Sequence, residues 1–163
     1  MNEEKWMCKA IKQAEKALQL DEVPIGCVIV KDGKVIASGY NKREKNQISL
    51  DHAEIIAIRK ACKKLGTWRL EDCELYVTLE PCPMCAGAII QSRIPKVIYG
   101  ASDPKGGSVY SVVNLFEIKE YNHHPEYKKG VLQEECAQLL KDFFKEKRKR
   151  NKEMKKKNAS LPL

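Results

Sequence analysis

The stretch that most constrains this chain is residues 78–88, which read TLEPCPMCAGA. The apolar run at 75–79 predicts a strand that leads into it, and the two prolines end that strand. Pro83 suits the first position of a following helix, because its missing N–H would be unpaired there in any case. Cys82 and Cys85 then lie close to one helical turn apart, so their sulfur atoms can point toward one place. A helix N-terminus favours thiolates, and the pair is therefore suited to binding a metal ion.

Two cysteines with this spacing also occur in redox sites and in structural zinc sites, so a second feature must decide. His52 and Glu54 stand at the start of another expected helix, and His52 with Cys82 and Cys85 makes a ligand set that zinc prefers. No fourth ligand stands at a matching spacing, which is typical of catalytic sites that keep one position for water. Glu54 should point away from the metal and toward that water. A carboxylate there acts as acid and base in the zinc-dependent nucleobase deaminases, whose signature is H-x-E followed by P-C-x-x-C.

The bulk properties describe an ordinary globular chain. Its 163 residues and 43% hydrophobic content fit one domain. No apolar run is long enough to span a bilayer, and the N-terminus lacks the layout of a secretory signal, so we expect no membrane contact. Seven cysteines, an odd number without regular spacing, fit a reducing compartment and predict a cytoplasmic protein.

Positive charge is concentrated at the C-terminal end. Residues 141–157 contain ten of the 30 Lys and Arg residues against three acidic ones, so they carry most of the net charge of +8. Such a segment can bind a polyanion through counterion release, which favours nucleic acid binding over a merely solubilising tail. We therefore divide the chain into a zinc-dependent deaminase domain, residues 1–150, and a basic tail, residues 151–163, which we expect to be disordered.

Hydrophobic periodicity and turn signals predict alternating helices and strands. We expect helices over 3–18, 52–65, 83–91 and 134–150, and strands over 27–30, 34–37, 75–79 and 96–100. Asp51 is the expected cap of the second helix, Asp32-Gly33 predicts a hairpin, and the polar segment 41–50 should be an irregular loop. Strands joined through helices should be parallel neighbours, with helices on both faces of the sheet.

These features lie within a resemblance that covers nearly the whole chain. The sequence is similar to the bacterial tRNA-specific adenosine deaminases, of the cytidine deaminase-like superfamily. The matching positions are residues 22–26, 41, 52–54, 75–88, 92–93, 99–101, 103–107, 122–123 and 143–144. The resemblance implies an α/β protein with a three-layer α/β/α fold, whose mixed central sheet of about five strands has helices on both faces.

The resemblance also implies a function. It implies hydrolytic deamination of the wobble adenosine in the anticodon stem-loop of an arginine tRNA, giving inosine, by a homodimer with one Zn²⁺ in each subunit. It implies that Asn41 binds the target base. It further implies that Asp103, Lys105, His123 and Phe144 lie along the RNA path.

Two positions depart from the family pattern, and two other functions fit the same residues. Asp51 stands where the family usually has Ala or Thr, and residues 109–112 stand where it commonly has a Gly-Ser-Leu run. The zinc signature also occurs in deaminases of free bases or nucleosides, of the guanine, cytosine or cytidine type, which would not need the basic tail. A non-catalytic RNA-binding module with a structural zinc would need a fourth protein ligand, for which Cys27 and His123 are candidates.

Overall fold

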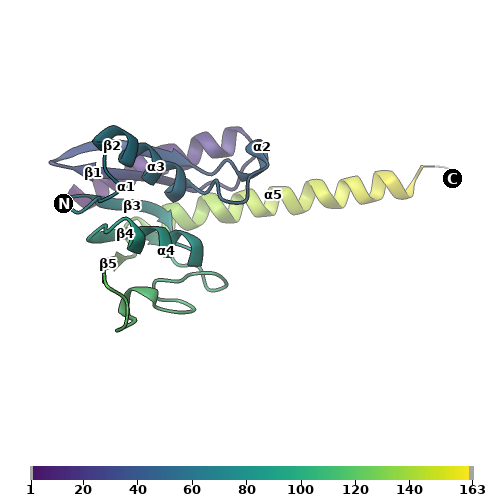
Figure 1. The fold of residues 1–163 in the computed structure, drawn as a ribbon. Helices are drawn as coiled ribbons and strands as arrows, with labels where there is room; N and C mark the ends of the chain where they lie inside the picture. The colour runs from purple at the N-terminus through teal and green to yellow at the C-terminus, as the bar shows by residue number, and fades with distance from the viewer. Residues whose placement is uncertain (1, 162–163) are drawn as a thin grey trace.

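The fold is built on a mixed sheet of five strands in the order β2-β1-β3-β4-β5 (Figure 1). In this computed structural model, which describes residues 2–161, β1 pairs antiparallel with both β2 and β3, and β4 pairs parallel with β3 and β5. A hairpin at Asp32-Gly33 joins the first two strands, as the sequence predicts. The strands are β1 Gly26–Lys31, β2 Lys34–Tyr40, β3 Glu74–Leu79, β4 Lys96–Ala101 and β5 Glu126–Lys129.

Alternation of side chains along the strands divides the core between the two faces of the sheet. On one face, Cys27 and Ile29 of β1 pack in a cluster with residues of α3 and α4, such as Ala57 and Ile89. On the other face, Val28 packs in a second cluster with α1 and the beginning of α5. The three layers confirm the expected α/β/α fold. The helices are α1 Asn2–Gln19, α2 Arg43–Asn46, α3 Ala53–Leu65, α4 Pro83–Gln91, α5 Gln133–Ala159 and the short 3₁₀ helix η1 Leu115–Glu117.

The strand directions correct one expectation. The chain reaches β3 from β2 through α3, yet the neighbour of β3 on that side is β1, which runs antiparallel to it. The hairpin is the cause, because it inserts β1 between β2 and β3. The parallel rule holds for β3 and β4, which α4 connects. The sequence also does not predict α2, η1 or β5, because segments of three or four residues are too short to show periodicity.

The last helix corrects the expectation of a disordered tail. α5 continues to Ala159, so residues 151–159 are helical, while residues 162–163 lie outside the described part of the chain. Lys, Arg, Glu and Met are good helix formers and extend a helix whose beginning is packed on the sheet. Arg150 also donates two hydrogen bonds to the Asp21 carboxylate, at 2.7 and 3.1 Å. Beyond this contact the helix projects away from the body (Figure 1).

No helix within residues 2–161 combines the length and the apolar character needed to cross a membrane.

Candidate active site

Three side chains from two helices meet in one cluster that could hold a metal ion. One donor atom from each of His52, Cys82 and Cys85 lies within 4.8 Å of the other two. The Nδ1 atom of His52 is 3.6 Å from the Sγ atom of Cys82 and also 3.6 Å from that of Cys85. The structure therefore brings together the three residues that the sequence assigns to the metal, although His52 is 30 residues from Cys82.

The cluster lies at the N-termini of α3 and α4. His52 is the N-cap residue of α3 and Cys82 that of α4, and both have extended backbones. Neither side chain makes a capping hydrogen bond to its helix, and both face the cluster. Two positive helix ends at one place favour thiolates and other anions. The expected cap of α3, Asp51, stands one residue too early, and its carboxylate instead accepts a hydrogen bond of 2.7 Å from Asn46 Nδ2.

The surroundings of the two cysteines shift the pKa values of their thiols in opposite directions. Hydrogen bonds that Cys82 accepts from the Cys85 thiol and from His52 lower the pKa of Cys82 to about 4. The resulting thiolate and burial both raise the pKa of Cys85. The Cys82 contact also raises the pKa of His52. The lowered pKa of Cys82 favours its thiolate, which is the form that ligates metals.

Glu54 lies beside this cluster without belonging to the group of three donors. It stands in the first turn of α3 and is buried, with 4% of its surface exposed. Burial raises its pKa to about 7, and its carboxyl group is within hydrogen-bonding reach of Cys85. A carboxyl group poised near neutral pH can both accept and donate a proton.

Asn41 is held close to His52 by the loop that separates them. It follows β2 and is buried, and its Oδ1 atom accepts a hydrogen bond of 3.1 Å from the N–H of Arg43. Its Nδ2 atom donates to the carbonyl oxygen of Val23 over 3.4 Å. The next N–H along the chain, that of Lys42, donates to the carbonyl oxygen of Asp51 at 3.0 Å. This hydrogen bond joins the two ends of the loop, and Asn41 and His52 lie directly outside it.

The other four predicted site residues lie outside the cluster. Asp103 and Lys105 stand on the loop after β4, where the Asp103 carboxylate accepts a hydrogen bond of 3.1 Å from the N–H of Lys105. The Nε2 atom of His123 is 2.7 Å from the carbonyl oxygen of Ile94. Phe144, on α5, is 41% exposed and stacks edge-on against Phe143.

Neither candidate for a fourth protein ligand joins the donor group. Within residues 2–161 the group comprises one His and two Cys residues only. Cys27 is fully buried in the core beside the sheet, and His123 contacts the carbonyl oxygen of Ile94, between α4 and β4. This arrangement disfavours a closed structural metal site, which needs four protein ligands.

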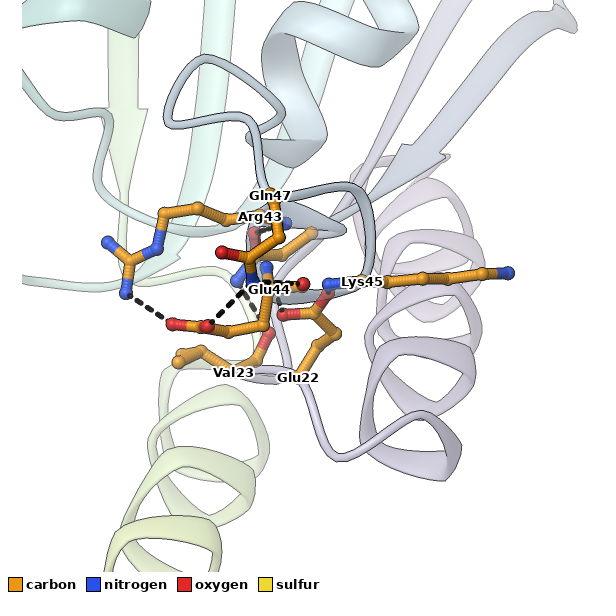
Figure 2. Close-up of polar contacts among 7 residues, drawn as sticks. Glu22, Val23, Arg43, Glu44, Lys45 and Gln47 are labelled. Carbon is orange, nitrogen blue, oxygen red and sulfur yellow. Dashed lines mark hydrogen bonds and ion pairs between the residues drawn. The ribbon is translucent and has the colours of Figure 1, made fainter.

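Sequence reasoning missed two buried carboxylates that shape the loops beside the cluster. The Glu22 carboxylate accepts hydrogen bonds from the N–H groups of Glu44 and Lys45, at 3.0 and 2.8 Å, and so fixes the beginning of α2 (Figure 2). Glu80 does the same for the loop after β4. Burial acts to raise its pKa, but hydrogen bonds from Ser111 and from the loop backbone outweigh burial and lower it. A Glu between an apolar strand and Pro81 is the one sequence signal that could have revealed it.

Comparison with known proteins identifies relatives over almost the whole chain. A family model for MafB19-like deaminases matches residues 1–148. The tRNA-specific adenosine deaminase of Bacillus subtilis is 53% identical over 150 residues, which cover 92% of this chain and 93% of that protein. The enzyme of the same name from Agrobacterium fabrum is 51% identical over 140 residues, covering 85% of this chain and 91% of its own.

Solved structures agree with the sequence relatives. One comes from a study of A-to-I editing by tRNA:A34 deaminases at the wobble position of transfer RNA. It has a TM-score of 0.81 and 46% identity, and the match covers 83% of this chain and 99% of that one. A guanine deaminase from Bacillus subtilis has a TM-score of 0.60 and 45% identity, over 63% of this chain and 66% of its own. The chain therefore belongs to the MafB19-like deaminases and, among them, to the family of tRNA-specific adenosine deaminases.

Proposed function

We propose that this protein converts adenosine to inosine at the wobble position of a tRNA anticodon. The observation that carries the proposal is the 53% identity, over 92% of the chain, with a protein named tRNA-specific adenosine deaminase. The reaction consumes one water and releases ammonia, so the site needs a nucleophilic water, a proton carrier and a pocket for the base. A tRNA substrate implies that the protein works in the cytoplasm.

The His/Cys/Cys cluster supports Zn²⁺ as the cofactor, one ion in each chain. In a tetrahedral site with Zn–S of about 2.3 Å and Zn–N of about 2.1 Å, a nitrogen and a sulfur ligand lie roughly 3.6 Å apart. The two distances from His52 Nδ1 to the cysteine sulfurs are both 3.6 Å, which fits this geometry. A zinc ion held by three protein ligands supplies a water that ionises near neutral pH.

Glu54 is the proposed catalytic acid and base. It takes one proton from the attacking water and passes it to the ring nitrogen beside C6 as C6 becomes tetrahedral. It then takes the second proton, from the new C6 hydroxyl, and gives it to the amino group, which leaves as ammonia while C6 becomes the carbonyl carbon of inosine. Its raised pKa, about 7, supports both directions of transfer at neutral pH. Its burial beside Cys85 keeps the carboxyl group near the attacking water and away from bulk solvent.

Asn41 is the proposed contact to the target base. An amide offers two donor hydrogens and two acceptor lone pairs. The contacts with Val23 and Arg43 use one of each, so one donor and one acceptor remain for the purine. The same two contacts hold the amide in a fixed orientation. The base must leave its stack to reach this position, which costs less in an anticodon loop than in a duplex.

Asp103, Lys105, His123 and Phe144 are proposed to lie along the RNA path. Lys105 and Phe144 are exposed, as contacts to phosphate and to a stacked base require.

We also propose that the protein forms a homodimer. Exposed apolar surface supports this proposal, because a second copy could bury it; the residues are Tyr110, Val112 and Tyr121. Size-exclusion chromatography with light scattering tests the dimer.

Editing of total tRNA tests the proposed function directly. The purified, zinc-loaded protein is incubated with total tRNA, and anticodons are sequenced for A-to-G changes at the wobble position. We expect conversion in at least one tRNA. Guanine is assayed in parallel for ammonia release, because one similar structure is a guanine deaminase. Ammonia from guanine with unedited tRNA would instead assign the protein to the deaminases of free bases.

A further inference from the structure

Glu80 has more hydrogen-bond partners than its place at the end of a strand requires. It follows β3 directly, is 2% exposed, and precedes Cys82 by two residues. Its Oε1 atom accepts from the N–H of Asp103, at 3.1 Å, and from the Ser111 hydroxyl. Its Oε2 atom accepts from the N–H groups of Val109, Tyr110 and Ser111, at 3.3, 2.9 and 2.9 Å. These five donors are backbone or hydroxyl groups, and all belong to one loop.

That loop, residues 102–111, is fixed at both ends by the same side chain. One contact holds its beginning at Asp103 and four hold its end at 109–111. Gly107 lies between them, and a Cβ atom there would collide with the Glu80 carboxylate. The backbone can approach the carboxylate this closely only because position 107 has no side chain. The N–H of Ser108 also donates to the carbonyl oxygen of Pro81, at 2.9 Å.

The order imposed by Glu80 extends to the exposed part of the loop. The N–H of Asp103 donates to Glu80, and the Asp103 carboxylate in turn accepts from the N–H groups of Lys105 and Gly106, both at 3.1 Å. Two carboxylates in series thus determine where the backbone of Lys105 lies. Because Glu80 is only two residues before Cys82 in the chain, its hydrogen bonds also fix the loop relative to the His/Cys/Cys cluster.

We propose that Glu80 is a positioning residue that presents the 102–111 loop to RNA. This inference rests on the proposed function, because Asp103 and Lys105 act in it as RNA contacts. The loop is already ordered before RNA binds, so binding does not lose free energy in ordering it. A released loop should therefore weaken RNA binding while the chemistry at Glu54 stays intact. A purely structural role predicts something else, namely fewer active molecules with an unchanged KM.

The test compares Glu80→Gln and Gly107→Ala with the wild-type chain, using a synthetic anticodon stem-loop RNA. The amide of Glu80→Gln keeps the volume of the side chain but places its own N–H groups opposite an N–H group of the loop. The Cβ atom of Gly107→Ala collides with the Glu80 carboxylate and displaces the loop from it. We expect each variant to raise KM about tenfold with kcat within about twofold, because a buried donor loses its partner. Zinc content should not change. Hydrogen exchange at the amides of 103 and 109–111 should accelerate.

Glu74→Gln is the matched control, because Glu74 lies at the other end of β3 and its side chain accepts a hydrogen bond only from the Tyr76 hydroxyl among the described residues. It should leave KM and loop exchange as in the wild type. An unchanged KM in both test variants overturns the proposal, and so does a loss of kcat alone. The affinity for the same RNA, measured by fluorescence anisotropy, separates this inference from the proposed function. Wild-type protein that edits nothing contradicts the function, whereas equal RNA affinity of wild type and Glu80→Gln contradicts the role of Glu80.

Discussion

The backbone N–H of Lys42 donates to the carbonyl oxygen of Asp51 over 3.0 Å, and this bond closes the neck of the loop between β2 and α3. Asn41 precedes the first of these residues and His52 follows the second. This hydrogen bond therefore holds the backbone at the proposed base contact beside the backbone at one proposed zinc ligand. Asp51 contributes a second closure through its side chain, which Asn46 binds.

Replacing Glu54 should abolish catalysis without damaging the site. Glu54→Ala should keep the fold and bound zinc but lower kcat by roughly 10²–10⁴-fold, because the proton carrier is removed. The measurements are inosine formation on an anticodon stem-loop, zinc content and thermal unfolding. Glu54→Gln, which keeps the volume, controls for the loss of packing. Inosine formation at a near wild-type rate in either variant would falsify the assignment of Glu54.

Removing one cysteine of the cluster should remove the metal. Cys82→Ala should lose zinc and lower the free energy of unfolding by more than about 2 kcal/mol, because metal binding is coupled to folding. Metal analysis and chemical denaturation measure the two effects. Cys8→Ala is the control, since Cys8 is exposed on α1 and outside the donor group. Full zinc occupancy in Cys82→Ala would contradict the proposed ligand set.

The projecting half of α5 should contribute charge to RNA binding. Replacing its last four lysines by glutamine should weaken stem-loop binding and flatten its dependence on salt, because each lost phosphate contact removes about 0.7–0.9 from the slope. The change keeps the Arg150–Asp21 contact and the length of the helix. The positions are 152, 155, 156 and 157.

The matched control for this prediction replaces four exposed lysines of α1, at positions 5, 9, 12 and 16. It removes the same net charge from a different part of the surface. Equal slopes for the two quadruple variants would show that overall charge, rather than α5, governs binding.

A methyl group at Gly39 should displace α3 and with it His52. An ideal Cβ there would lie 2.5 Å from the carbonyl oxygen of Ala53 and 2.9 Å from the N–H nitrogen of Ala57. Gly39→Ala should therefore cost about 1–3 kcal/mol of stability and reduce zinc affinity. Gly87→Ala is the opposite case, because a Cβ at this α4 position meets no atom within 4 Å. It should stabilise the protein by about 0.5–1 kcal/mol.

Glu3 should stabilise the fold in a pH-dependent way. A hydrogen bond from Lys128 lowers its pKa, burial opposes this, and Lys96 lowers it further. Because the folded pKa lies below the unfolded one, the stabilisation is present above the unfolded value, near 4.5, and is lost as pH falls through the folded value. Glu3→Gln should cost about 0.5 kcal/mol at pH 7 and less at pH 3.

Glu4→Gln controls for the charge in the first turn of α1, since no ion pair within residues 2–161 involves Glu4. Thermal unfolding at the two pH values compares the variants. A cost for Glu3→Gln that is equal at pH 7 and pH 3, or no larger than that for Glu4→Gln, would contradict the prediction.

The sequence predicts most of the fold and the centre of the site because both depend on local patterns. Apolar periodicity defines α1, α3 and α4, and the chemistry of His and Cys identifies the donor set. The order of the strands is different, since the place of β1 between β2 and β3 depends on how separate segments pair. Propensity could have predicted the length of α5, but a dense run of like charges argued against order there.

The buried carboxylates were beyond sequence reasoning for a related reason. Glu22 and Glu80 look like ordinary charged residues until the loops that they bind are folded around them. Apart from the Ser111 hydroxyl, their partners are backbone N–H groups 22 to 31 residues away, and backbone groups leave no trace in the sequence. The role of Asp51 was misassigned because its side chain closes a loop instead of capping a helix.

His52 and Cys82 lie at the starts of α3 and α4, the helices that precede and follow β3 along the chain, and this arrangement has a consequence for biogenesis. Neither half of the nascent polypeptide carries the complete set of proposed ligands, because the imidazole and the thiols become neighbours only when both helices have docked on the sheet. Binding of the proposed zinc ion would therefore report completed assembly, and a ribosome-bound fragment that ends before residue 82 should bind no zinc at this site.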